Sequence, residues 1–250
     1  MKKLMIAAAA TLCAAVGFSA VESANIVGYS AETVARSAYK AYTVRYLNPG
    51  DTSGKVAIQD LINQTNPGKG ADATKATADK LYIWNGSSYD LYYLHTSGKW
   101  CAEGSTTPTE AAVDFGTAFF YKKGSLTQGT ATVSGEVYDA ADSYTVTLTR
   151  GSMKFLTFPW PVEQTLEQIG ACITNPGKGA DSTKPTADKI YKWNGSSYDI
   201  YYRHTSAGWC AEGSTTAVEE GSVRFGINEG FFVKKGSLTA GGITFANPLR

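Results

Sequence analysis

The sequence is poor in the residues from which most metal centres and nucleophilic active sites are built. Its 250 residues include only 4 cysteines, 3 methionines and 2 histidines. It also contains no Gly-x-Ser-x-Gly nucleophile elbow, and no two acidic residues are identifiable as a general acid and base couple. We therefore expect a protein that is not an enzyme and that requires no cofactor.

A strong charge of either sign is also missing. The 23 lysines and arginines nearly balance the 22 acidic residues, so the formal net charge is +1. Such a balance provides no electrostatic attraction toward nucleic acid or anionic lipid, and nucleic acid is not an expected partner. The many tyrosines and glycines, with moderate charge, are instead typical of an ordered globular protein.

Residues 1–20 have the pattern of an export signal. Lys2 and Lys3 precede an apolar run over residues 4–18, and Ser19-Ala20 provides small residues for cleavage. This run is shorter than the about 20 apolar residues that a membrane span needs, and no second run follows it. We predict a secreted protein of the periplasm, outer surface or medium, without a membrane span after cleavage. An uncleaved signal that acts as an anchor is the alternative.

The chain contains an internal repeat, which predicts its domain organisation. Residues 66–107 align without gaps to residues 175–216, and only eight of these 42 positions differ. A repeat of about 110 residues is long enough for each unit to hold its own core. We therefore predict two tandem domains, a first unit of residues 25–137 and a second unit of residues 138–250.

Each unit is predicted to be mainly β with one short helix, as a β-sandwich or barrel-like module. Alternating β-branched and aromatic residues predict the strands, and Asn-Gly pairs predict tight hairpin turns. The predicted strands cover residues 42–46, 81–84, 89–94, 119–122 and 131–137, and in the second unit residues 144–148 and 154–158. The last two strands of the first unit are expected to pair. Apolar residues at helical spacing predict a helix over residues 162–173, with a counterpart near residues 56–64.

Three segments of the second unit resemble a β-rich repeat module of uncharacterised secreted bacterial proteins. Phe155–Trp160, Trp193–Tyr198 and Gly230–Val233 are similar to its aliphatic-Ser-x-Pro strand, its W-D/N-G-x-x-aromatic hairpin and its P-G-x-G-aromatic strand. The first unit departs from this pattern, because it has Thr117-Ala118 in place of Glu229-Gly230. The resemblance implies tandem β modules without catalytic activity.

The hairpins carry aromatic and acidic residues that could bind a sugar ring. The candidates are Tyr92, Trp100 and Asp90 in the first unit and Tyr201, Trp209 and Asp199 in the second. Tyr92 shares a strand face with Leu94, whose counterpart is Arg203, so this face is expected to be partly exposed. Tyr89 and Tyr93 alternate to the opposite face and are expected in the core. Ordinary packing of cross-strand aromatic pairs is the alternative.

The two histidines and two of the cysteines stand at matched positions in the units. His95 precedes Cys101 by six residues, as His204 precedes Cys210. These four side chains could bind zinc if the units brought them together, but they could equally be polar strand ends and small buried residues. Exported cysteines tend to form disulfides, and a Cys172–Cys210 bridge within one unit is favoured. Pairing of Cys101 with either of these cysteines, or no bridge, stays open.

A glycine-rich segment, residues 66–72, is copied at residues 175–181. It lacks the Gly-Lys-Ser/Thr ending of a phosphate-binding loop, so we predict a surface loop. Repeated acidic residues nearby, among them Asp79 and Asp188, could hold calcium, but their spacing fits no EF-hand pattern.

Three functions are compatible with these patterns. We favour a secreted, non-catalytic protein with a structural or adhesive role at the cell surface, whose partner is a cell-surface glycan or an envelope protein. The alternative is a carbohydrate-binding protein that uses the hairpin aromatics. An exported hydrolase of unrecognised type is the third hypothesis.

Overall fold

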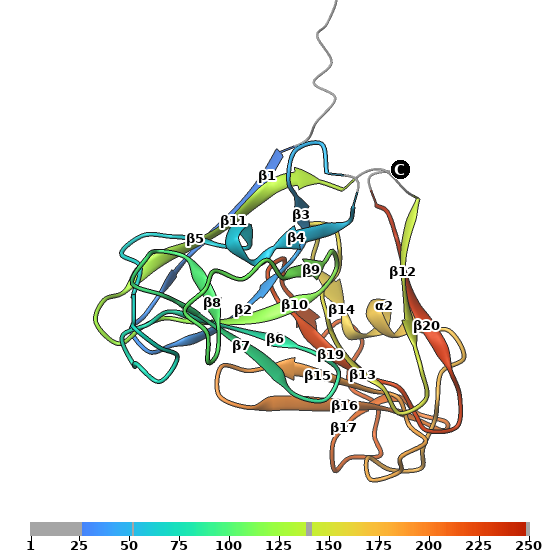
Figure 1. The fold of residues 1–250 in the computed structure, drawn as a ribbon. Helices are drawn as coiled ribbons and strands as arrows, with labels where there is room; N and C mark the ends of the chain where they lie inside the picture. Colours follow the sequence, from blue (N-terminus) through green and yellow to red (C-terminus); the bar gives the residue numbers. More distant parts are fainter. Residues whose placement is uncertain (1–26, 52, 139–141, 249–250) are drawn as a thin grey trace, which may run out of the picture.

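The computed structural model describes residues 27–51, 53–138 and 142–248, so the predicted export signal lies outside the described residues. Within these ranges the chain consists mainly of antiparallel strands with a single α-helix, which confirms the prediction of a mainly β fold. The first half of the chain, blue to green in Figure 1, lies beside the second half, yellow to red. None of the helices in these ranges is long and apolar enough to cross a membrane.

Each half of the chain contains a five-stranded antiparallel sheet, and the two sheets have the same strand order. The first sheet has the order β2 (Tyr39–Thr43), β10 (Ala118–Lys122), β6 (Lys80–Trp84), β7 (Tyr89–Leu94) and β8 (Trp100–Ala102). The second has the order β13 (Met153–Leu156), β19 (Phe231–Lys234), β15 (Lys189–Trp193), β16 (Tyr198–His204) and β17 (Gly208–Ala211). The two halves therefore share one sheet topology.

Further strands form a second layer in each half. In the first half they are β1 (Val27–Val34), β11 (Gly129–Val137), β3 (Tyr46–Leu47) and β5 (Asn63–Gln64), with the separate pair β4 (Lys55–Ala57) and β9 (Ala112–Asp114). In the second half β12 (Ser143–Leu148) pairs with β20 (Gly241–Ala246), and β14 (Gln164–Thr165) pairs with β18 (Arg224–Phe225). Each hydrophobic core contains residues from both layers, for example Phe119 and Val133 in the first half. The arrangement is therefore sandwich-like.

Strands β10 and β11 both form, but they do not pair with each other. β10 lies between β2 and β6, whereas β11 pairs with β1, β3 and β5 in the other layer. The segment between them starts at Lys123, whose side chain is buried in the interior. The chain thus passes from one layer to the other, and the predicted pairing of residues 119–122 with residues 131–137 is wrong.

The predicted helix is present in the second unit. α2 (Leu166–Ala171) is shorter than the expected range of residues 162–173. It begins with a capping box, in which the Thr165 hydroxyl accepts the Gln168 N–H and the Gln168 side chain accepts the Thr165 N–H. These two reciprocal bonds satisfy backbone donors that would otherwise lack partners.

The helix predicted near residues 56–64 is wrong, because the first unit has only the 3-10 helix η1 (Ile58–Asp60) there. Val56 occupies the position of Thr165 in the repeat and cannot cap a helix; it pairs with Val113 instead. Gln59 also has another role, since its side chain donates to the Trp100 carbonyl at 2.8 Å.

The hairpin between β6 and β7 forms as predicted, and the asparagine side chain shapes its turn. Asn85 Oδ1 accepts the backbone N–H groups of Ser87 and Ser88 at 3.1 and 2.9 Å. Gly86 has a φ of 107°, a value that a side chain would strain. The same bonds recur at Asn194 in the second unit.

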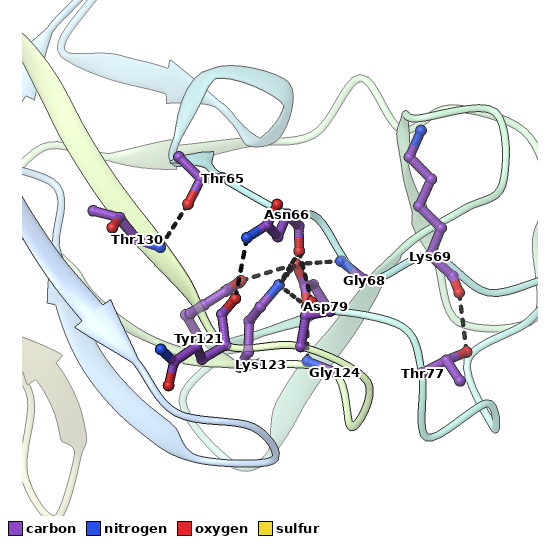
Figure 2. Close-up of polar contacts among 12 residues, drawn as sticks. Thr65, Asn66, Gly68, Lys69, Thr77, Asp79, Tyr121, Lys123, Gly124 and Thr130 are labelled. Atoms are coloured by element: carbon purple, nitrogen blue, oxygen red, sulfur yellow. Dashed lines mark hydrogen bonds and ion pairs between the residues drawn. The ribbon is translucent and has the colours of Figure 1, made fainter.

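A buried ion pair holds the glycine-rich loop of the first unit. Asp79 and Lys123 are 0% and 1% exposed, and their charged groups lie 3.1 Å apart. The Asp79 carboxylate also accepts the N–H groups of Gly68 and Gly124 at 3.0 and 2.7 Å and the Tyr121 hydroxyl at 2.9 Å. Figure 2 shows these donors converging on the one carboxylate. The loop is thus fixed by a fully bonded buried charge.

The second unit repeats this ion pair. Asp188 and Lys235 are both 0% exposed, at 2.9 Å from each other. The Asp188 carboxylate accepts the N–H groups of Gly177 and Gly236 at 2.9 and 2.7 Å. In both units, therefore, the lysine ammonium occupies the place beside the carboxylate that a bound cation would need.

Candidate functional site

One face of each five-stranded sheet is covered with aromatic side chains, and these two faces meet. Because side chains alternate along a strand, every second residue of the hairpin strands lies on this face. The contributing residues are Tyr82, Trp84, Tyr89 and Phe120 from the first unit and Phe155, Tyr191, Trp193, Tyr198 and Phe232 from the second. We call the contact between these two aromatic faces the junction.

The contacts across the junction are reciprocal. The ring of Trp84 lies 5.3 Å from that of Phe232, and Trp193, its counterpart in the repeat, lies 5.3 Å from Phe120. Both pairs meet edge to face, at interplanar angles of 87° and 70°. Since Phe120 and Phe232 also occupy equivalent positions, the two units are related approximately by a twofold axis at the junction.

The two sides of this axis differ, and one side is closed by polar bonds. On that side Trp84 Nε1 donates to the Met153 carbonyl at 2.9 Å. The Thr157 N–H donates to the Gly116 carbonyl at 3.0 Å, and Arg45, itself 1% exposed, donates to the Thr157 hydroxyl at 3.1 Å. Burial lowers the pKa of Arg45 to about 10, still well above neutral pH, so the guanidinium remains charged.

The opposite side of the junction is open. An apolar pocket of about 250 Å³ is lined by Tyr39, Tyr82, Tyr89, Phe120, Trp193 and Tyr198. A larger cleft of about 830 Å³ adjoins it and includes Tyr39, Lys40, Glu32, Lys192, Trp193, Asn194, Asn228 and Glu229. Tyr39 and Trp193 line both hollows, so the pocket and the cleft adjoin at these two side chains, one from each unit.

The acidic and basic groups of the cleft neutralise one another. Lys40 lies 2.6 Å from Glu32, and Lys192 lies 3.0 Å from Glu229. Glu163, on the cleft wall, forms an ion pair with Arg224 at 2.6 Å. The cleft therefore has many polar groups but little net charge.

Asn228 stands out among the polar residues of the cleft. Its amide Nδ2 donates to Glu32 of the other unit at 3.3 Å. Its carbonyl oxygen Oδ1 is buried and has no hydrogen-bond partner among the described residues. A buried acceptor without a donor costs free energy, so the site gains if a ligand hydroxyl or amide bonds to it.

The pKa values of the tyrosine hydroxyls at the open side are shifted in different directions. Burial, followed by the bond to Tyr198, raises the pKa of Tyr89, and burial also raises the pKa of Tyr82. Partial burial alone would raise the pKa of Tyr39, but its bond to Tyr82 and the Lys122 ammonium lower that pKa to a net value below 10.0. The raised pKa values of Tyr82 and Tyr89 favour their neutral hydroxyls, which can donate or accept hydrogen bonds.

The sequence-predicted aromatic candidates lie away from the junction. Trp100 and Trp209 are only 3% and 4% exposed. Trp209 borders a hollow of about 320 Å³, but the Arg203 guanidinium covers its ring at 5.8 Å. The two indoles therefore expose little ring surface on which a sugar could stack.

The remaining hairpin candidates act in the hairpins themselves. Tyr92 and Tyr201 are half-buried against the two cores, as their expected partial exposure requires. Asp90 and Asp199 are exposed and accept hydrogen bonds from the turn asparagines at 2.8 and 2.9 Å. Their carboxylates thus brace the turns.

Two expectations about the hairpin faces need correction. The strand face of Leu94 is expected to be partly exposed to solvent. Leu94 is only 4% exposed, however, and belongs to the core of the first unit. Its counterpart Arg203 covers Trp209, so a leucine and an arginine both shield an indole at this position. Tyr93 is buried as predicted, whereas Tyr89 is half-buried at the junction.

The histidines and thiols do not form a metal site. Within the part of the chain that the structure describes, no three histidine, cysteine or acidic side chains converge on one point. His204 Nδ1 accepts the Ala207 N–H at 3.0 Å, and His95 Nδ1 contacts the Ser97 hydroxyl at 3.0 Å. Both histidines thus cap the loops that follow their strands.

The predicted Cys172–Cys210 bridge is not formed, and the three described cysteines are free thiols. Cys210 lies in a small cluster with Tyr202, whereas Cys172 packs against the main core of the second unit. Burial raises the pKa of Cys101, Cys172 and Cys210, which disfavours the reactive thiolate.

Comparison with known proteins finds no family model, no curated protein and no solved structure that matches this chain. The resemblance to a secreted β-rich repeat module therefore stays a prediction, and the site is interpreted from its own residues.

No pattern in the sequence marked Tyr39 or Asn228, which line the open side of the junction. A signal was present in the repeat: Lys192 stands where the first unit has Ile83, and only the lysine position belongs to the cleft. Positions at which duplicated units differ in polarity thus indicate where their environments differ.

Proposed function

We propose that this chain is an exported, non-catalytic protein with a structural or adhesive role at the cell surface. The observation that supports this most is the reciprocal packing at the junction, where Trp84 and Trp193 each contact the other unit. This packing favours a single rigid body in which the two units keep a constant spacing. An envelope glycan or an envelope protein is the proposed partner.

A fixed pair of similar units suits adhesion for a physical reason. When one unit has bound a repetitive surface, the second contact becomes intramolecular and gains from a high effective concentration. A rigid junction avoids the loss of conformational entropy that a flexible linker would incur on binding. The near-neutral charge of the chain favours recognition by shape and hydrogen bonds over electrostatic attraction.

The acidic, thiol and histidine side chains that a hydrolase could use form structural contacts instead. The oxygens of Asp79 and Asp188 accept hydrogen bonds from backbone N–H groups and buried lysines. The thiols have raised pKa values, and both histidines bond to loops beside their own strands. These structural contacts support the proposal that the protein binds a partner and does not catalyse a reaction.

The proposal is tested by cell fractionation and by cosedimentation. We expect the chain in the envelope or medium fractions of the bacterium that encodes it. Purified mature protein should sediment with isolated envelopes in a saturable way, also at high salt, because little of the binding is electrostatic. An unrelated protein of similar charge is the control. Retention in the cytoplasmic fraction, or no sedimentation at any envelope concentration, contradicts the proposal.

A further inference from the structure

We propose that the cleft and the apolar pocket on the open side of the junction bind a neutral polysaccharide chain. This inference rests on the proposed surface function and assigns its ligand class and its site. The site differs from the hairpin aromatics at residues 92, 100, 201 and 209, because it exists only where the two units meet.

The first argument comes from comparing two equivalent indoles. Trp84 Nε1 donates to the Met153 carbonyl at 2.9 Å on the closed side of the junction. Trp193 occupies the same position in the second unit, lines both hollows, and has no hydrogen bond from Nε1 within the described residues. The approximate symmetry is thus broken where a ligand could enter, and a tryptophan N–H remains available there.

The second argument is the shape and chemistry of the surface. The pocket is apolar and almost entirely aromatic, with Tyr39 and Trp193 at the boundary to the polar cleft. The cleft volume of about 830 Å³ lies in the range of small-molecule sites. A pyranose ring has a flat apolar face and a rim of hydroxyls, so it can stack on an aromatic ring while its hydroxyls reach the polar wall.

The third argument is the hydrogen-bonding capacity of the cleft wall. The buried Asn228 Oδ1 lacks a donor among the described residues, and a sugar hydroxyl supplies one. The side chains of Lys40 and Lys192 supply donors, and Glu32 and Glu229 supply acceptors. A hydroxyl group, which both donates and accepts, matches such a mixed wall better than a ligand with only one kind of group.

The fourth argument selects a neutral glycan over an anionic one. Each lysine of the cleft is paired with a glutamate, at 2.6 Å for Lys40 and 3.0 Å for Lys192. An anionic ligand would have to compete with these carboxylates for the lysine ammonium groups. A neutral chain of sugars bonds to the ion pairs without separating them.

The experiment uses the mature protein and isolated envelopes that are treated in two ways. Periodate oxidises the vicinal diols of glycans, and protease removes envelope proteins. We expect cosedimentation to be lost after periodate and retained after protease. The reverse result would identify an envelope protein as the occupant and overturn this inference, while the proposed surface function would stand.

Direct binding and three variants locate the site. Neutral cello-, malto- and xylo-oligosaccharides, all of which contain vicinal diols, are titrated against the protein, and tryptophan fluorescence and calorimetry report binding. We expect one saturable site per chain for at least one of these series. Asn228→Ala and Trp193→Phe should weaken its affinity about five- to tenfold, as the loss of one hydrogen bond does.

Trp84→Phe is the matched control, because it removes the same indole N–H from the closed side. It should lower the stability of the fold but change the affinity by less than about twofold. Equal losses of affinity in Trp84→Phe and Trp193→Phe would indicate a purely structural role and overturn the inference. Envelope binding that all three oligosaccharide series fail to inhibit, and that Asn228→Ala leaves intact, would also overturn it.

Discussion

The hydroxyls of Tyr89 and Tyr198 lie 3.4 Å apart across the junction, although these residues occupy the same position in the two repeats. Identical positions meet in this way only near a twofold axis. The chain therefore resembles a homodimer whose two subunits have become one polypeptide. Because the two units are in one polypeptide, their association does not depend on concentration, and the two sides of the axis can differ in sequence.

Phe155 is the central contact of the junction, and its truncation should be costly. Its ring is stacked on Phe120 of the first unit at 4.9 Å and on Phe232 at 4.3 Å, and it is 2% exposed. We expect Phe155→Ala to lower the free energy of unfolding by about 3–5 kcal/mol, measured by urea denaturation. Leu238→Ala, at a residue that is 66% exposed, should change it by less than about 0.5 kcal/mol. Similar changes in unfolding free energy for the two variants would contradict a central packing role of Phe155 at the junction.

The buried ion pairs predict a non-additive mutant series. Asp79→Ala leaves the ammonium of Lys123 buried without its partner, so we expect a loss of about 3–5 kcal/mol in unfolding free energy. Asp188→Ala should cost a similar amount in the second unit, where Lys235 is left. The double variant Asp79→Ala, Lys123→Met should be more stable than Asp79→Ala alone, because no unpaired charge remains. A double variant that is no more stable than Asp79→Ala would contradict this role of the ion pair.

The buried tyrosines predict a loss of stability at high pH. Burial raises the pKa of Tyr144 from 10.0 to about 12, and it also raises the pKa of Tyr89. A raised folded-state pKa means that the neutral hydroxyl is favoured by folding. This contribution is complete below pH 10 and is lost as the pH rises through 12.

The measurement is an alkaline titration followed by tyrosinate absorbance and by circular dichroism. We expect a group of tyrosines to ionise only together with unfolding. Complete ionisation of all tyrosines near their ordinary pKa, with the fold intact, would show that these hydroxyls are not buried.

The free thiols predict slow chemical modification. Cys101 and Cys210 are 0% exposed and their pKa values are raised by burial, so a thiol reagent should react slowly with the native protein. After unfolding without a reductant, we expect three reactive thiols per mature chain, from the cysteines at 101, 172 and 210. A single reactive thiol would instead indicate a disulfide between two of them.

The sequence was sufficient for the parts of the fold that depend on local signals. The hairpin of residues 81–94 was predictable because Asn85-Gly86 favours a turn and alternating aromatics favour strands. The helix in the first unit was mispredicted because its apolar spacing resembles that of α2, while Val56 in place of Thr165 removes the cap. A pattern of apolar residues alone does not show whether the backbone N–H and C=O groups at the ends of a helix have hydrogen-bond partners.

The candidate site could not be predicted from the sequence, for a different reason. Burial of Trp100 and exposure of Tyr39 depend on which sheet face meets the second layer and which meets the other unit. Both faces of the hairpin are rich in aromatics, so strand alternation separates the faces but does not assign them. The cleft at Asn228 arises only after the two units have packed, and no single segment contains it.

The reciprocal junction is tested most directly by a double-mutant cycle between Trp84 and Phe232, whose rings lie 5.3 Å apart in different units. Unfolding free energies are measured for Trp84→Ala, Phe232→Ala and the double variant. A contact across the junction predicts a coupling energy of about 0.5–1.5 kcal/mol. Additivity of the two substitutions within about 0.3 kcal/mol would mean that the aromatic faces do not meet, and it would contradict the account.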